Sequence, residues 1–210
     1  MVLTADHAVA PIPENAKEQG LDGARPPVAD MLGELQAKVA EHFGPGRYFL
    51  SGKGSLKPRL TDGNLYYDHA VLEEKKLAPE TLTAFIREWA LNTGVFHAVY
   101  GRDQLLEGRA PGVIGQRIAN GFNGERSGDV VLILKPWLIA GTGKAATGTT
   151  HGSPFSYDTH IPIIFYGAPF KAGRYADEFS ITDLAPTLSA GLGIQEPPMC
   201  MGKPLVRALK

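Results

Sequence analysis

Two side chains that can bind a divalent metal stand next to each other near the start of the chain, Asp6 and His7. They follow residues 1–5, an apolar stretch that predicts a short strand. In α/β proteins, ligands bind at the carboxyl ends of strands. A carboxylate beside an imidazole suits Zn²⁺ or another borderline divalent ion. Asp68-His69 repeats the dipeptide, so on this pair alone a hydrogen-bonded surface pair is the favoured interpretation and a metal site is the alternative.

A second stretch of potential ligands is GTTHGSPFSYDTHIPIIFYG, residues 148–167. It is a Gly/Thr-rich loop that carries His151, Asp158 and His160 and runs into an apolar segment. Polar side chains placed on a loop just before a core strand often serve function. The alternative is a turn, in which the same side chains satisfy local backbone groups. Both interpretations stay open on the residues alone.

Composition excludes several classes of partner and chemistry. Lys and Arg total 21 against 22 Asp and Glu, and the net charge of −1 favours neither a nucleic acid nor an anionic membrane as partner. The single Cys200 excludes an intrachain disulfide, and no Cys-x-x-Cys site is present. No Gly-x-Ser-x-Gly nucleophile motif occurs. The N-terminus lacks a secretory signal pattern, and no apolar run approaches the ~20 residues of a membrane span.

Hydrophobic periodicity predicts how these residues are positioned. Helices are expected over about 30–42, 79–94 and 180–193, and strands over 95–101, 129–137 and 161–167. Helices that alternate with fully apolar strands predict an α/β fold, a layered sheet with helices on both faces. We expect residues 1–44 and 128–210 to form this core. The more polar stretch 45–127, with short strands at RYFLSG and GNLYYDHAVL, is expected to form an inserted α+β lobe.

Four stretches carry a resemblance to a known family. LTADHAVAP, SGDVVLILKPW, GTTHGSPFSYDTHIPIIFYG and ITDLAPTLSAGLGI with MGKPL resemble, in this order, the C-terminal portion of the alkaline phosphatase superfamily. The most similar branch is the type I phosphodiesterase/nucleotide pyrophosphatase group, which includes bacterial alkaline phosphatases with a Thr nucleophile. The resemblance covers nearly the whole chain. Ala8 stands where the family usually has Gly, and Ala fits there unless its φ is positive.

The resemblance implies a two-zinc hydrolase of phosphate esters, in which a Thr or Ser attacks phosphorus. Matched residue by residue, Asp6 and His7 fall on ligands of one zinc and His151 on a ligand of the other. His160 is the less favoured alternative to His151. The family's nucleophile and remaining ligands precede the Asp-His motif, so we expect the chain to hold part of the site and to be inactive alone. The family suggests a periplasmic or secreted location.

Two other interpretations stay open. The chain could be a truncated, non-enzymatic binding or assembly module, or one half of a split enzyme whose front half is a separate chain. An N-terminal strand that becomes a sheet edge exposes unpaired backbone groups and favours self-association. Whether the intact protein would be a phosphomonoesterase or a phosphodiesterase is also left open.

Overall fold

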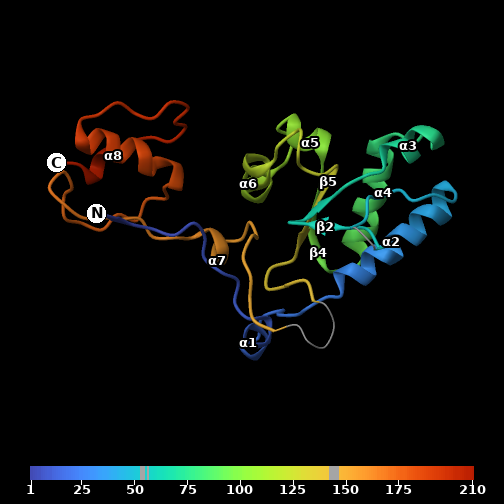
Figure 1. Ribbon diagram of the computed structural model, residues 1–210. Helices are drawn as coiled ribbons and strands as arrows, with labels where there is room; N and C mark the ends of the chain where they lie inside the picture. The colour runs from blue at the N-terminus through green and yellow to red at the C-terminus, as the bar shows by residue number, and fades with distance from the viewer. Residues whose placement is uncertain (53–54, 56, 142–146) are drawn as a thin grey trace. The chain divides into compact units, whose positions relative to one another are not determined.

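The computed structural model describes residues 1–52, 55, 57–141 and 147–210 (Figure 1). The chain divides into two compact units, a smaller one of Met1–Ala8 with His160–Lys210 and a larger one of Val9–Thr159. These boundaries differ from the predicted division into a core and an inserted lobe at 45–127. The placement of such a lobe within the family fold stays a prediction.

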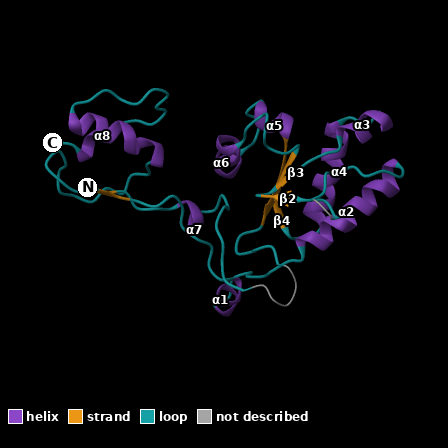
Figure 2. Cartoon of the chain, in the orientation of Figure 1, coloured by secondary structure: helices purple, strands orange, loops and turns teal. Residues whose placement is uncertain are grey.

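A four-stranded sheet organises the larger unit (Figure 2). Its order is β2-β3-β5-β4, and the strands are β2 (Leu60–Thr61), β3 (Asn64–Leu65), β5 (Val130–Leu134) and β4 (Phe96–Gly101). Each neighbouring pair runs antiparallel. β5 lies between β3 and β4, and its first four residues are buried. The apolar run around β5 was therefore correctly predicted as a strand covered on both faces.

Helices cover both faces of this sheet, as the sequence predicted (Figure 1). Side chains alternate along β5, so Val130 and Leu132 join one core cluster and Val131 and Ile133 the other. The first cluster includes side chains of α2 (Val28–Phe43) and α4 (Pro79–Asn92). The second includes side chains of α5 (Arg102–Leu106) and α6 (Gly112–Gly121).

Glycine and proline residues explain where the two long helices begin or end. α2 spans the stretch predicted at 30–42 and stops at Gly44, whose φ of 94° an L side chain rarely adopts. α4 begins at Pro79, whose missing N–H costs nothing in a first turn, and is followed by Gly94 at φ 72°. No helix in the described ranges is long and apolar enough to cross a membrane.

The structure corrects three local predictions. The segment HAVL was predicted as strand but opens α3 (His69–Lys75), because the Asp68 side chain accepts a hydrogen bond from the Val71 N–H at 3.3 Å and caps a helix. The stretch 8–27, where the sequence predicted no helix, contains the short helix α1 (Pro13–Glu18). The predicted buried strand 161–167 reduces to β6 (Ile164–Phe165), which is half exposed.

The smaller unit has little apolar core of its own. β1 (Val2–Leu3) pairs antiparallel with β6. The predicted helix at 180–193 is present as η2 (Ile181–Asp183) leading into α8 (Leu184–Leu192), with a Ser180 capping box. A last turn, η3 (Val206–Ala208), carries Ala208, the unit's one buried hydrophobic side chain among its described residues. This unit therefore gains little stability from burial.

One aspartate connects several parts of the larger unit through hydrogen bonds. Asp129 directly precedes β5, and its Oδ2 accepts the Tyr67 N–H at 2.8 Å while its Oδ1 lies 2.8 Å from His69 Nε2. Its backbone N–H donates to Leu65 and its carbonyl accepts from Arg102. The side chain is 11% exposed. The start of β5, the end of β3, the start of α3 and the start of α5 all depend on this residue.

Asp129→Ala should therefore destabilise the chain. It leaves the Tyr67 N–H without its acceptor, and we expect the free energy of unfolding to fall by about 1–3 kcal/mol. Urea denaturation followed by circular dichroism measures the change. Asp22→Ala removes an exposed carboxylate and is the matched control. Equal midpoints for the two variants would contradict the role given to Asp129.

Candidate metal centre

Asp6 and His7 form a compact pair of donors in the smaller unit. They follow β1, as predicted, with side chains that are 88% and 36% exposed. The His7 N–H donates to Asp6 Oδ1 at 3.0 Å, and Asp6 Oδ2 lies 3.6 Å from His7 Nε2. The other ring nitrogen, Nδ1, lies 2.7 Å from the Ala8 carbonyl oxygen. As a donor to that carbonyl, Nδ1 carries the ring proton and leaves the Nε2 lone pair beside the carboxylate.

Ala8 fits the backbone at the position where the family usually has Gly. Among the described residues other than glycine, positive φ occurs at Asp62, Lys76, Trp137 and Met199. Ala8 is not one of them, so its methyl group causes no backbone strain. The expectation that Ala is tolerated here is confirmed.

His151 belongs to the larger unit and lies exposed on the loop that precedes α7 (Ser156–Thr159). The residues before it are hydrogen-bonded to the N-terminal part of the unit. The Ala10 N–H donates to the Thr150 carbonyl at 3.0 Å, and the Thr149 hydroxyl donates to the Ala10 carbonyl. Gly152 follows with a φ of 102°, a conformation that favours glycine. His151 thus lies between a hydrogen-bonded segment, residues 149–150, and Gly152 with its positive φ.

A buried carboxylate holds the loop after His151. Asp158 is 3% exposed, and its Oδ2 accepts the Ser153 N–H at 2.7 Å. Within the described part of the chain, Asp158 Oδ1 and Ser153 Oγ are buried without a hydrogen-bond partner. Buried polar atoms of this kind are uncommon and call for a partner. The sequence pointed to Asp158 as a candidate, and the structure gives it a positioning contact to the loop.

The predicted ligands are distributed between the two units. Asp6 and His7 lie in the smaller unit, His151 lies in the larger, and His160 is the first residue of the returning smaller-unit segment. Across the residues that the structure describes, no three His, Cys, Asp or Glu side chains gather in metal-binding geometry. The joint role of Asp6, His7 and His151 as zinc ligands stays a prediction.

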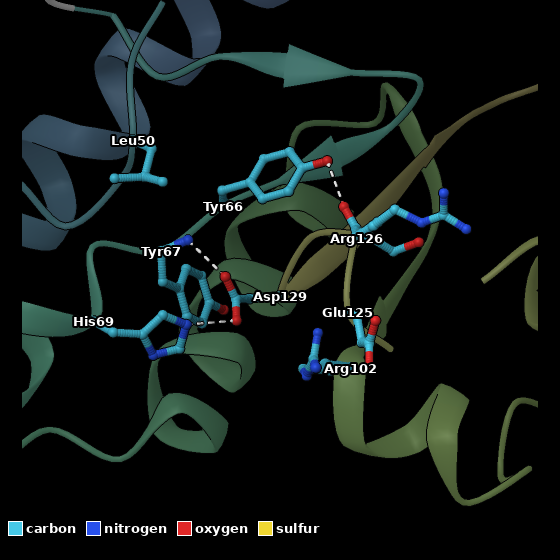
Figure 3. A pocket seen from close by; sticks show the side chains of 9 residues that line it. Leu50, Tyr66, Tyr67, His69, Arg102, Glu125, Arg126 and Asp129 are labelled. Carbon is cyan, nitrogen blue, oxygen red and sulfur yellow. Dashed lines mark hydrogen bonds and ion pairs between the residues drawn. The ribbon is translucent and has the colours of Figure 1, made fainter. Parts of the chain in front are cut away.

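Sequence reasoning missed a second His-Asp pair, which lines a pocket of about 370 Å³ (Figure 3). His69 Nε2 and Asp129 Oδ1 are 2.8 Å apart although 60 residues separate them. Tyr66 and Leu50 line another side of the pocket, and the Tyr66 hydroxyl donates to the Arg126 carbonyl at 3.3 Å. His69 and Asp129 are too far apart in the chain for sequence spacing to reveal that they form a pair.

No family model matches the chain. It is 31% identical over 182 residues to alkaline phosphatase PafA of Elizabethkingia meningoseptica, a match covering 87% of this chain and 32% of that protein. It is 31% identical over 211 residues to a calcium-transporting ATPase of Myroides odoratus, covering 100% of this chain and 37% of that protein. The crystal structure of wild-type PafA matches with a TM-score of 0.84 and 29% identity, covering 100% of this chain and 38% of that chain.

These matches agree with the resemblance found in the sequence motifs. The similarity extends along the chain and includes its three-dimensional structure. The chain spans about a third of the length of these relatives. It therefore belongs to the alkaline phosphatase superfamily of hydrolases and has the mixed α/β fold of the matching part of PafA.

Proposed function

We propose that the chain supplies Asp6, His7 and His151 to the two-zinc site of a phosphate ester hydrolase of the phosphodiesterase/nucleotide pyrophosphatase type. Asp6 and His7 would hold one zinc and His151 the other. Bound zinc would polarise the phosphoryl oxygens of the ester. The nucleophile would come from polypeptide outside these 210 residues, and the chain alone would not turn over substrate.

The geometry of Asp6 and His7 is the observation that carries this proposal. A tetrahedral zinc with bonds of about 2.0–2.1 Å to oxygen and nitrogen keeps those two atoms about 3.3 Å apart. Asp6 Oδ2 and His7 Nε2 are 3.6 Å apart, close to that spacing. The contact of Nδ1 with the Ala8 carbonyl resembles the outer hydrogen bond that fixes the ring of metal-binding histidines.

The donor types fit zinc, but their number does not complete a site. Catalytic zinc takes three protein ligands and structural zinc takes four. Asp6 and His7 provide two ligands, and His151 would provide one to the other ion. Partial coordination predicts weak binding by the isolated chain, because each missing ligand removes a bond that would offset the dehydration of the ion.

The first test is zinc binding by the purified chain. We expect binding in the micromolar range or weaker, and His7→Ala should weaken it about tenfold or more, since one of two ligands is lost. Isothermal titration calorimetry of the metal-free chain with zinc measures both values. His42→Ala removes an exposed imidazole elsewhere and is the matched control. Equal losses of zinc affinity in His7→Ala and His42→Ala would contradict the assignment of His7 as a ligand.

Activity provides a separate check. We expect no turnover of 4-nitrophenyl phosphate by the chain with added zinc, since the attacking hydroxyl group is proposed to come from other polypeptide. Turnover well above background that disappears in His151→Ala would mean that the chain builds a working site by itself, and the proposed division of the site would be wrong.

A positioning role for Asp158 gives a further prediction. Its carboxylate holds the Ser153 N–H, so Asp158→Ala should free the loop that carries His151. We expect amide hydrogen exchange across residues 151–155 to accelerate about tenfold or more, as a charge-assisted bond is lost. Asp158→Asn keeps an acceptor and should exchange more slowly than Asp158→Ala. Unchanged exchange in both variants would leave Asp158 without this role.

A second candidate function, an assembly module, is favoured by the exposed apolar surface. In the smaller unit, Tyr166, Leu192, Ile194, Met199 and Met201 are each at least 60% exposed. Exposed apolar surface on this scale favours a protein partner. The partner would be the rest of a phosphatase fold or a second copy of the chain.

Self-association is the measurable consequence for the isolated chain. We expect light scattering with size-exclusion chromatography to give a mass that increases with concentration. The double variant Leu192→Asp with Ile194→Asp should shift the chain toward monomer, because charges oppose apolar contact. Val113→Asp, at an exposed apolar position of the larger unit, is the control. A monomeric wild-type chain at high concentration would count against self-association.

A further inference from the structure

A second pocket lies against the loop that carries His151. It encloses about 330 Å³ within the larger unit, near the lower end of the roughly 300–1,000 Å³ typical of ligand sites. Its walls come from the end of α6, the β2–β3 turn, β5 and the segment 152–159. Because every wall belongs to one compact unit, the pocket is a feature of that unit alone.

The walls combine an apolar surface with few charges. Ile118 and Phe122 line the pocket near the end of α6, and Val131 lines it from β5. Arg117 is the cation among the lining residues, and its Nη1 donates to the Pro154 carbonyl at 2.7 Å. Asp62 is the carboxylate among them. Such a surface suits a small, mostly apolar organic group, and it has too few cations for a polyanion.

The pocket adjoins the segment that directly follows the candidate metal ligand His151. Gly152, which directly follows His151, lines it, as does Ser153. The hydrogen bond from Arg117 to Pro154 and the one from Ser153 to Asp158 hold this wall in place. A group bound here would therefore contact the segment that directly follows the residue proposed to hold one zinc.

We propose that this pocket receives the alcohol part of the phosphate ester and selects for aryl esters. The inference rests on the proposed function, because Gly152 lines the pocket and directly follows His151, the residue proposed to hold one zinc. Ile118, Phe122 and Val131 would contact the ring. They are specificity residues, since burial of the ring in an apolar pocket adds to the binding of the phosphoryl group.

Binding of 4-fluorophenol to the metal-free chain tests the pocket directly by ¹⁹F NMR. We expect saturable binding at millimolar concentrations and intermolecular NOEs from the ring to the Ile118 methyl groups. Gly121 lines the pocket, and a Cβ there meets no atom within 4 Å. Gly121→Leu should fill the space and weaken binding about fivefold or more. Gly33→Leu, on α2, where a Cβ would meet only the Lys57 Cγ at 3.8 Å, should leave binding unchanged.

The outcomes separate this inference from the proposed function. NOEs to Ile118 together with a loss of affinity in Gly121→Leu would support the pocket even if zinc fails to bind Asp6 and His7. Zinc binding without ring contacts at Ile118 would support the metal site and overturn the pocket. Equal affinity of 4-fluorophenyl phosphate and inorganic phosphate for the zinc-loaded chain would overturn the selection for aryl esters.

Discussion

Burial of β5 on both faces is the constraint on which the larger unit depends. Val130 and Leu132 pack against the α2–α4 layer, and Val131 and Ile133 pack against the α5–α6 layer. Moving the strand by one residue would exchange the two sets of side chains, so its register is fixed by both layers at once. Asp129 stands at the entrance to this strand, which explains how one carboxylate can hold segments distant in sequence.

A buried hydroxyl chain reinforces the same region. The Thr83 hydroxyl donates to the Pro79 carbonyl at 2.9 Å, so Tyr67 must be the donor in its 2.8 Å contact with Thr83. Burial raises the pKa of the Tyr67 phenol well above its usual range, which keeps the proton available for that bond. The backbone N–H of Tyr67 is in turn held by Asp129. Apolar packing and polar contacts thus both hold α4 and the start of β5 in position.

Sequence patterns predicted best those elements whose own side chains decide their structure. α2, α4, α8 and β5 follow from periodicity, from Pro and Gly at their ends and from continuous apolar runs. α3 was missed because a single cap at Asp68 outweighed the strand pattern of its residues. β6 was overpredicted because its apolar residues are half exposed in the smaller unit. An apolar run reveals that a segment needs burial, but it does not reveal what supplies it.

The candidate site was predictable to the same limited extent. Motifs identified Asp6, His7 and His151 as residues with metal-binding chemistry, and the structure adds the spacing between Asp6 and His7. The pocket beside Gly152 could not be foreseen, because its walls come from segments up to 97 residues apart, from Asp62 to Thr159. Such a cavity results from packing between layers, and no local pattern encodes it.

The chain contains its own comparison of what an Asp-His dipeptide can become. In Asp68-His69 the carboxylate caps a helix and the imidazole contacts the distant Asp129, so the two side chains are held apart by separate partners. No helix or strand directly follows Asp6-His7, and Asp6 Oδ2 and His7 Nε2 lie 3.6 Å apart. The residues are identical, and their difference arises from the segment that follows them. A dipeptide motif therefore gains chemical meaning only from the backbone that positions it, and this is why Asp6-His7 is the pair proposed as metal ligands while Asp68-His69 stabilises the fold.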